Sequence, residues 1–356
     1  MKKCLLLSMT VAALVSCSKD KDPVIVIPPS SGSTMTLEGL DGKETGSTPG
    51  ANANNSVFVD FSTDKQTKVL RSSWDLGFYC GNDFKVKLNN TTFAFAKVTS
   101  KTDINAVGST DTAGVLLTFN QGNPPKLTTN VTDDISGDLS KLVIPTISAT
   151  ELDNKVVIIN RGIAGGVAAR DFMKVRILRN GTGYTLQYAK LTETTFKTVQ
   201  VSKNNDNDFI YVSLDNGTTV SDFPAKQDWD IQWTVGTYTT KFGADDVFYP
   251  FSDLIFINNL SGVTAFERVY ADANTAADAY TKFNKDSVAK YTFLNDRNVI
   301  SSNWRATTGA GKGVKKDRFY IVKDPAGNVY KLKFLSFTEE DGGTRGKPEI
   351  KYELIK

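Results

Sequence analysis

The stretch that decides the fold is Ser73-Trp74-Asp75-Leu76-Gly77-Phe78-Tyr79, because a variant of it recurs as Asp228-Trp229-Asp230-Ile231-Gln232-Trp233. In both copies large apolar side chains stand at every second position, which is the period of a β-strand with one buried face. The alternating residues are Trp74, Leu76 and Phe78 in the first copy and Trp229, Ile231 and Trp233 in the second. The sequence therefore predicts a Trp-Asp strand in each half of the chain.

The similarity between the two halves extends to both sides of these strands, which is the sign of an internal repeat. Upstream, residues 57–64 and 210–217 each have the pattern of a strand that runs into a turn. Downstream, residues 170–188 and 316–334 each have the pattern of a β-hairpin. We therefore expect an all-β protein of antiparallel sheets, hairpins and meanders, arranged as two tandem similar domains.

The second half also contains the clearest helix signal in the chain. Across residues 271–288, alanine and aromatic residues recur at helical spacing, and Asp272 or Asn274 is available to cap the first turn. We place the first β repeat at residues 56–205 and the second at residues 206–356, with one short helix in the second.

Length and composition agree with two domains and restrict the chemistry. The chain has 356 residues, enough for two domains with a core each, and a formal net charge of +3, which gives no sign of a nucleic-acid or anionic-membrane surface. It contains no histidine. Since histidine is the usual general base and the commonest metal ligand, we expect a binding protein and no enzyme.

The N-terminus has the form of a bacterial lipoprotein signal. Lys2-Lys3 is followed by an apolar run at residues 5–15 that is too short to span a membrane, and a Leu-Val-Ser sequence precedes Cys17. We interpret residues 1–17 as a lipoprotein signal peptide and Cys17 as the lipidated residue. The alternative is a plain secretory signal with an incidental cysteine.

The segment after Cys17 is expected to be a flexible tether. Residues 18–55 are rich in Pro, Ser and Gly and contain little apolar surface to bury. The charged residues 18–22 resemble the export tags of surface lipoproteins of the Bacteroidota. This predicts a protein that is lipid-anchored in the outer membrane and exposed at the cell surface.

A search for catalytic motifs gives mostly negative results. Cys80 is the one cysteine of the expected mature chain besides Cys17, and without a histidine to activate it we interpret it as an inert thiol. The glycine-rich residues 162–166 lack the Lys-Ser/Thr of a nucleotide loop. Asp75 and Asp230 recur in the two halves, and we expect each to hydrogen-bond a neighbouring loop at the strand edge.

Several motifs together resemble the HmuY-like haemophore family, as a long member with two repeats. They span nearly all of the expected mature chain, at residues 74–78, 303–305, 317–324, 327–335 and 342–354. The resemblance implies an all-β lipoprotein, anchored in the outer membrane, that takes haem and passes it to a TonB-dependent receptor.

The sequence departs from the family pattern at the iron ligands. The known arrangement uses two histidines, and the corresponding places here, near residues 245–249 and 307–309, contain none. Some relatives use methionines instead, and Met173 is the one methionine inside an expected domain. It could be an axial ligand or a core side chain. Tyr249 could bind ferric iron as a phenolate or simply pack.

Two functions therefore stay open after the sequence is read. The first is a surface protein that binds haem or a related porphyrin without histidine, in an apolar slot with aromatic walls and at most one Tyr or Met ligand. The second is a duplicated scaffold that has lost haem and binds another ligand or a partner protein at the cell surface.

Overall fold

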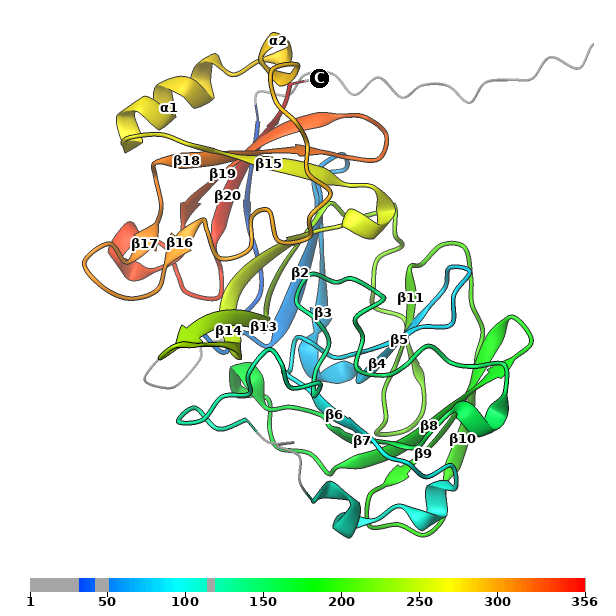
Figure 1. Cartoon of the computed structure of the whole chain (residues 1–356). Coiled ribbons are helices and arrows are strands. Elements are labelled where there is room, and N and C mark those ends of the chain that lie inside the picture. The colour runs from blue at the N-terminus through cyan, green and yellow to red at the C-terminus, as the bar shows by residue number, and fades with distance from the viewer. Residues whose placement is uncertain (1–31, 42–50, 114–118, 356) are drawn as a thin grey trace, which may run out of the picture.

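The computed structural model describes residues 32–41, 51–113 and 119–355, so the expected signal peptide with Cys17 lies outside the described residues. Over these ranges the chain forms 20 strands, paired antiparallel in several sheets, and two short helices (Figure 1). This confirms the all-β prediction.

Two five-stranded sheets lie at opposite ends of the molecule (Figure 1). The first consists, in order, of β10 (Lys197–Val201), β9 (Gly183–Lys190), β8 (Met173–Asn180), β7 (Val157–Asn160) and β6 (Phe95–Val98). The second consists of β1 (Ser33–Thr36), β20 (Glu349–Leu354), β19 (Val329–Ser336), β18 (Arg318–Lys323) and β15 (Thr264–Val269). Strands β8 and β9 pair, as do β18 and β19, so both hairpins expected from the repeat are present.

Two four-stranded sheets occupy the middle of the molecule, and they exchange strands between the halves of the chain. One contains β12 (Thr219–Val220), β11 (Phe209–Val212), β4 (Leu76–Tyr79) and β5 (Val86–Leu88). The other contains β14 (Asp245–Ile257), β13 (Ile231–Phe242), β2 (Asn55–Asp60) and β3 (Lys65–Leu70). Strand β2 of the first half thus pairs with β13 of the second, and β11 of the second pairs with β4 of the first. Both central sheets therefore contain strands from each side of the expected boundary between residues 205 and 206.

The two repeated aspartates, Asp75 and Asp230, accept hydrogen bonds from the loops that follow these exchanged strands. The backbone N–H of Leu214, which follows β11, donates to the Asp75 carboxylate at 2.7 Å. The backbone N–H of Phe61, which follows β2, donates to the Asp230 carboxylate at 2.8 Å. Each aspartate therefore binds the loop that the other half supplies, which confirms the expected hydrogen bond to a neighbouring loop.

A repeated asparagine completes the same turn in both halves. The side-chain amide of Asn89, which follows β5, donates to the carbonyl of Trp74 at 2.7 Å. The side-chain amide of Asn258, which follows β14, donates to the carbonyl of Trp229 at 3.0 Å. Equivalent side chains thus satisfy equivalent carbonyls beside both Trp-Asp strands, which supports the internal repeat.

The two aspartates differ in their charge environment. Asp75, 1% exposed, receives two hydrogen bonds of 2.8 Å from the Arg161 guanidinium. Asp230, 4% exposed, forms no ion pair with any residue that the structure describes. Burial, with smaller contributions from Asp60 and Asp324, raises the pKa of Asp230 to about 7. The carboxylate form of Asp230 is therefore costly to bury.

Replacing Asp230 by Asn will remove a pH-dependent loss of stability. Since the pKa of Asp230 is higher in the folded chain than in the unfolded chain, the protonated group stabilises the fold at low pH. That contribution falls by about 2.6 kcal/mol between pH 5 and pH 8. Urea unfolding at both values should show the advantage of Asp230→Asn growing by that amount. Asp75→Asn is the control and should destabilise, and a pH-independent difference for Asp230→Asn would contradict the argument.

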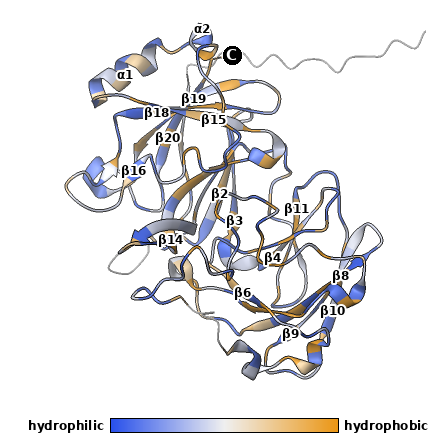
Figure 2. Cartoon of the chain, in the orientation of Figure 1, coloured by the Kyte–Doolittle hydropathy of each residue, from blue (hydrophilic) through white to orange (hydrophobic). Residues whose placement is uncertain are grey.

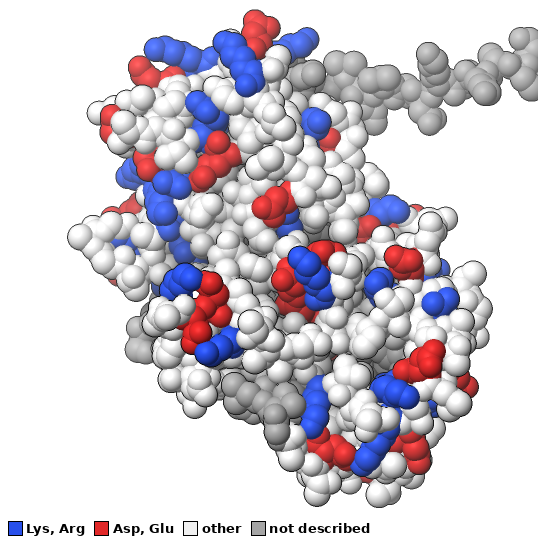
Figure 3. All heavy atoms as spheres, in the orientation of Figure 1, with Lys and Arg blue, Asp and Glu red and all other residues white. Residues whose placement is uncertain are grey.

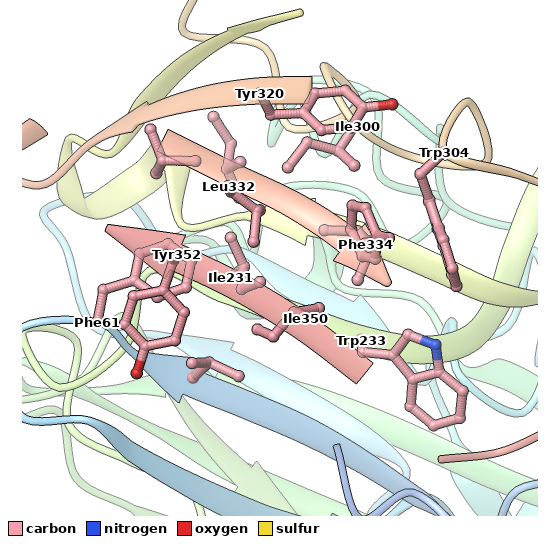
Figure 4. Close-up of a cluster of buried hydrophobic side chains, with 14 of the residues drawn as sticks. Phe61, Ile231, Trp233, Ile300, Trp304, Tyr320, Leu332, Phe334, Ile350 and Tyr352 are labelled. Atoms are coloured by element: carbon pink, nitrogen blue, oxygen red, sulfur yellow. The ribbon is translucent and has the colours of Figure 1, made fainter. Parts of the chain in front are cut away.

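The largest hydrophobic core joins the exchanged strand to the C-terminal sheet. Figure 4 shows Phe61 of the first half beside Tyr352, and Ile231, Trp233 and Ile350 in the same cluster. Apolar residues fall mainly on the strands and interleave with polar residues there (Figure 2). The alternation read from the sequence thus places one face of each strand in a core.

Strand β1 corrects part of the expected tether. Residues 33–36 pair with β20, with Met35 opposite Ile350, and Leu37 is fully buried in the same core. A Cβ atom at Gly39 would overlap the ring of Trp233. The described part of residues 18–55 therefore includes an ordered edge strand.

The expected helix is divided in two. Helix α1 (Ala273–Lys282) begins at Asp272, whose carboxylate accepts the N–H of Thr275 at 2.8 Å, and α2 (Lys285–Val288) follows. Phe283 has extended backbone angles because its ring is buried in a small core. The predicted helix is thus present as α1 with Asp272 as its cap, and the last part of the expected range, residues 285–288, forms the separate short helix α2.

The visible face of the molecule has no dominant charge (Figure 3). On the face drawn in Figure 3, Lys and Arg are interspersed with Asp and Glu. Within the described ranges, no helix has the length and apolar character needed to cross a membrane.

Candidate functional site

An aromatic cleft lies where the two halves meet, and both Trp-Asp strands contribute to it. It encloses about 100 Å³ and is lined by Trp74 and Trp229, by Phe58 of β2, by Tyr211 of β11, and by Phe223. The strand exchange brings these rings together, because β2 and β11 each cross to the other half.

The rings form a continuous wall across the junction. The rings of Tyr211 and Phe223 are stacked, with centroids 3.6 Å apart. Phe223 makes edge contacts with Trp74 and with Phe58, and Phe58 continues the series to Trp229 at 5.1 Å. The wall therefore presents several ring faces and edges to whatever enters the cleft.

Alternation along two strands explains why Phe58 and Lys87 face the cleft. Val57 and Val59 are buried in the large core, so Phe58 between them points to the opposite face of β2. Val86 and Leu88 likewise belong to the core of the first half, which leaves Lys87 on the cleft side of β5.

Lys87 stands among aromatic rings. Its ammonium nitrogen lies 3.9 Å from the ring centroid of Phe209 and 5.0 Å from that of Tyr211, and it donates to the Tyr211 hydroxyl at 3.2 Å. Burial, helped by the nearby Arg297, lowers the pKa of Lys87 to about 7. The ring faces act in the opposite direction, because they stabilise an ammonium ion.

Arg297 is another cation of the cleft, which Lys226 also lines. Its guanidinium carbon lies 3.8 Å from the ring centroid of Phe256, and burial lowers its pKa to about 10, so it stays charged at neutral pH. Within the part of the chain that the structure describes, no carboxylate lies within ion-pair distance of Arg297 or Lys87.

The carboxylates of the cleft are, by contrast, already bonded. Asp133 accepts the backbone N–H groups of Leu88 at 2.7 Å and Val143 at 2.9 Å. Burial raises the pKa of Asp133 to about 6. Asp208 accepts the hydroxyl of Ser261 at 2.7 Å. Asp133 and Asp208 therefore have hydrogen-bond donors in the protein, whereas neither Lys87 nor Arg297 has an ion-pair partner among the described residues.

The methionine predicted as an axial ligand lies elsewhere. Met173 is in β8, is 4% exposed and belongs to the core of the first half. It also lines a separate polar cavity of about 410 Å³, together with Arg161, Arg170 and Tyr188. Its position is that of a core side chain with one edge on this cavity.

The predicted tyrosine is on the long hairpin of β13 and β14. Tyr249 is half-buried, stands opposite Tyr238, and makes edge contacts with Phe119 at 5.3 Å and Phe251 at 6.2 Å. Tyr249 and Met173 lie in different sheets, and neither lines the aromatic cleft.

The two places that correspond to the ligand histidines of the family also lie apart from the cleft. Residues 245–249 begin β14, and residues 307–309 lie between β16 (Arg305–Ala306) and β17 (Gly313–Val314). Among the residues that the structure describes, no group of His, Cys, Asp and Glu could hold a metal ion.

Sequence reasoning missed Lys87 and Arg297 as residues of the cleft. Lys87 had a usable signal, because it alternates with Val86 and Leu88 and so occupies the face opposite the core. Arg297 had none, since it lies in a loop far along the chain. Cys80 agrees with its interpretation as an inert thiol, because burial raises its pKa.

Comparison with known proteins gives one match. The family model described as HmuY protein matches residues 52–352, which include both halves and all the residues named in the cleft. No curated protein and no solved structure matches the chain.

Proposed function

Because this chain belongs to the HmuY family, we propose that it is a surface-anchored lipoprotein that binds haem or a related porphyrin for uptake, without histidine ligation. The observation that carries the proposal is the match over residues 52–352, since the HmuY family is associated with haem binding. Cys17 would carry the lipid anchor in the outer membrane, and a TonB-dependent receptor would accept the ligand.

The residues of the aromatic cleft fit a porphyrin ring better than they fit its iron. The faces of Phe223 and Trp229 suit a flat aromatic ligand, and Lys87 and Arg297 suit its carboxylates. Neither a histidine nor a predicted axial ligand stands there, because the chain has no histidine and neither Met173 nor Tyr249 lines the cleft, while the Tyr211 hydroxyl already accepts a hydrogen bond from Lys87. Binding through the ring therefore makes the metal dispensable.

A titration with haem and with metal-free protoporphyrin tests this proposal. We expect saturable, stoichiometric binding of both with affinities within a few-fold, followed by absorbance and by quenching of tryptophan fluorescence. Met173→Leu and Tyr249→Phe should leave both affinities unchanged. A haem spectrum lost in Tyr249→Phe or Met173→Leu, with metal-free binding intact, would instead identify that residue as the axial ligand. Absence of binding by either ligand would end the porphyrin proposal.

The size of the cleft favours a second candidate, a ligand smaller than a porphyrin. The enclosed volume of about 100 Å³ is below the roughly 300–1,000 Å³ of typical small-molecule sites. On this alternative the scaffold has lost haem and binds another ligand, or a partner protein, at the cell surface. The same titration separates the candidates, because only the first requires porphyrin binding.

A further inference from the structure

We propose that the aromatic cleft selects ligands that combine a flat aromatic body with a carboxylate, and that Lys87 and Arg297 bind the carboxylate. The proposal shares its cleft with the proposed function and defines the ligand chemistry there. It applies to a porphyrin acid and equally to a small aromatic acid.

The carboxylates of the cleft have more hydrogen-bond partners in the protein than its donor groups have. Asp133 and Asp208 accept hydrogen bonds from backbone or hydroxyl groups, whereas Lys87 makes one hydrogen bond, to a neutral tyrosine. The side-chain nitrogen of Asn90, which also lines the cleft, is buried without a hydrogen-bond partner in the described structure. The cleft thus has donors that lack partners and carboxylates that already have them. A ligand that supplies hydrogen-bond acceptors would satisfy these donors.

Lys87 and Arg297 are both half-buried in the cleft, and partial removal of two cations from water is costly. Burial and the charge of Arg297 lower the pKa of Lys87 to about 7 in spite of the opposing effect of Asp208 and Asp133, and burial lowers the pKa of Arg297 in spite of Asp133. A carboxylate between partly desolvated cations offsets this cost, because charge-assisted hydrogen bonds are the strongest that a protein makes. A cationic ligand is disfavoured by the same two charges.

Aromatic rings hold both cations in place. Lys87 lies against Phe209 and Tyr211, and Arg297 lies against Phe256. A methyl group at Gly137 would approach the Arg297 side chain at 2.9 Å, so the loop closes tightly over it. Little side-chain entropy remains to be lost when a carboxylate binds.

Two pairs of ligands distinguish the contribution of the carboxylate from that of the aromatic ring. They are protoporphyrin with its dimethyl ester, and naphthoate with naphthalenemethanol. We expect each acid to bind at least tenfold more tightly than its uncharged analogue. Lys87→Met and Arg297→Gln should each weaken binding of the acids by about tenfold and leave the uncharged analogues unchanged. Lys85→Met is the matched control and should change nothing, because Lys85 does not line the cleft and its ammonium donates to the Thr146 hydroxyl.

The outcomes distinguish this inference from the proposed function. Naphthoate binding that depends on Lys87 and Arg297, without porphyrin binding, would support the inference and remove the porphyrin function. Equal binding of protoporphyrin and its ester, unaffected by both variants, would overturn the inference and keep the function. Melting temperatures check folding, and both variants should melt at or above the temperature of the unsubstituted protein, because each removes a partly buried, unpaired charge.

Discussion

Replacing Arg161 by Met will lower the free energy of unfolding by about 3–5 kcal/mol, because it leaves the Asp75 carboxylate buried without its main partner. Two guanidinium nitrogens of Arg161 lie 2.8 Å from the Asp75 oxygens, and both side chains are almost fully buried. Arg170, at 3.2 Å from Asp75, compensates only part of the charge. Urea unfolding at neutral pH measures the loss.

Two controls separate the buried charge from the lost contacts. Asp75→Asn combined with Arg161→Met should recover part of the stability, because no carboxylate is then left without its partner. Lys282→Met removes an ion pair in which both side chains are 78% exposed and should change stability by less than about 0.5 kcal/mol. If Arg161→Met costs less than the surface variant, Arg170 is sufficient and the argument is wrong.

Replacing Trp304 by Ala will also cost about 3–5 kcal/mol, the usual range for a large core aromatic. Trp304 is fully buried, its ring stacks on Phe334 with centroids 4.2 Å apart, and its indole N–H donates to the Asp253 carbonyl at 3.0 Å (Figure 4). The substitution therefore opens a cavity and removes a buried donor.

Trp304→Phe divides these two contributions. It keeps an aromatic ring against Phe334 but leaves the Asp253 carbonyl without its donor, so we expect a loss of about 1–3 kcal/mol. Trp229→Ala, at the half-buried wall of the cleft, should cost less than Trp304→Ala in the same urea measurement. A larger effect at Trp229 would show that the cleft, and not the C-terminal core, dominates stability.

Elements defined by local patterns could be predicted from the sequence. The hairpins at residues 170–188 and 316–334 and the helix cap Asp272 depend on alternation or on hydrogen bonds to near neighbours. Such signals lie within a few residues of each other, so tertiary context seldom overrides them.

Strand partners could not be predicted, because two strands of the repeat satisfy the same pattern. The strands at residues 57–64 and 210–217 both offer one apolar face, and pairing with either Trp-Asp strand would bury it. Strand β1 escaped notice for a different reason. Residues 33–36 pair mainly through backbone at a sheet edge, where side chains give little signal.

The candidate site was the least predictable part. The aromatic residues of the cleft are visible in the sequence, but their convergence depends on the strand exchange. Met173 and Tyr249 were chosen as donor types, and donor type carries no information about whether a side chain faces a cavity. Their roles as ligands stay predictions.

The strand exchange also determines what happens if the chain is cut between the halves. Pairs such as Val59 with Ile231 and Phe78 with Ile210 join residues 172 and 132 positions apart, by subtraction of their numbers. A single nick in the exposed residues 204–206 would leave each fragment holding a strand that pairs with the other fragment. The fragments would stay interlocked without a covalent link, and neither would hold a complete set of sheets alone. The two halves together, and not either half alone, are therefore the smallest unit that can be truncated or secreted in a folded state.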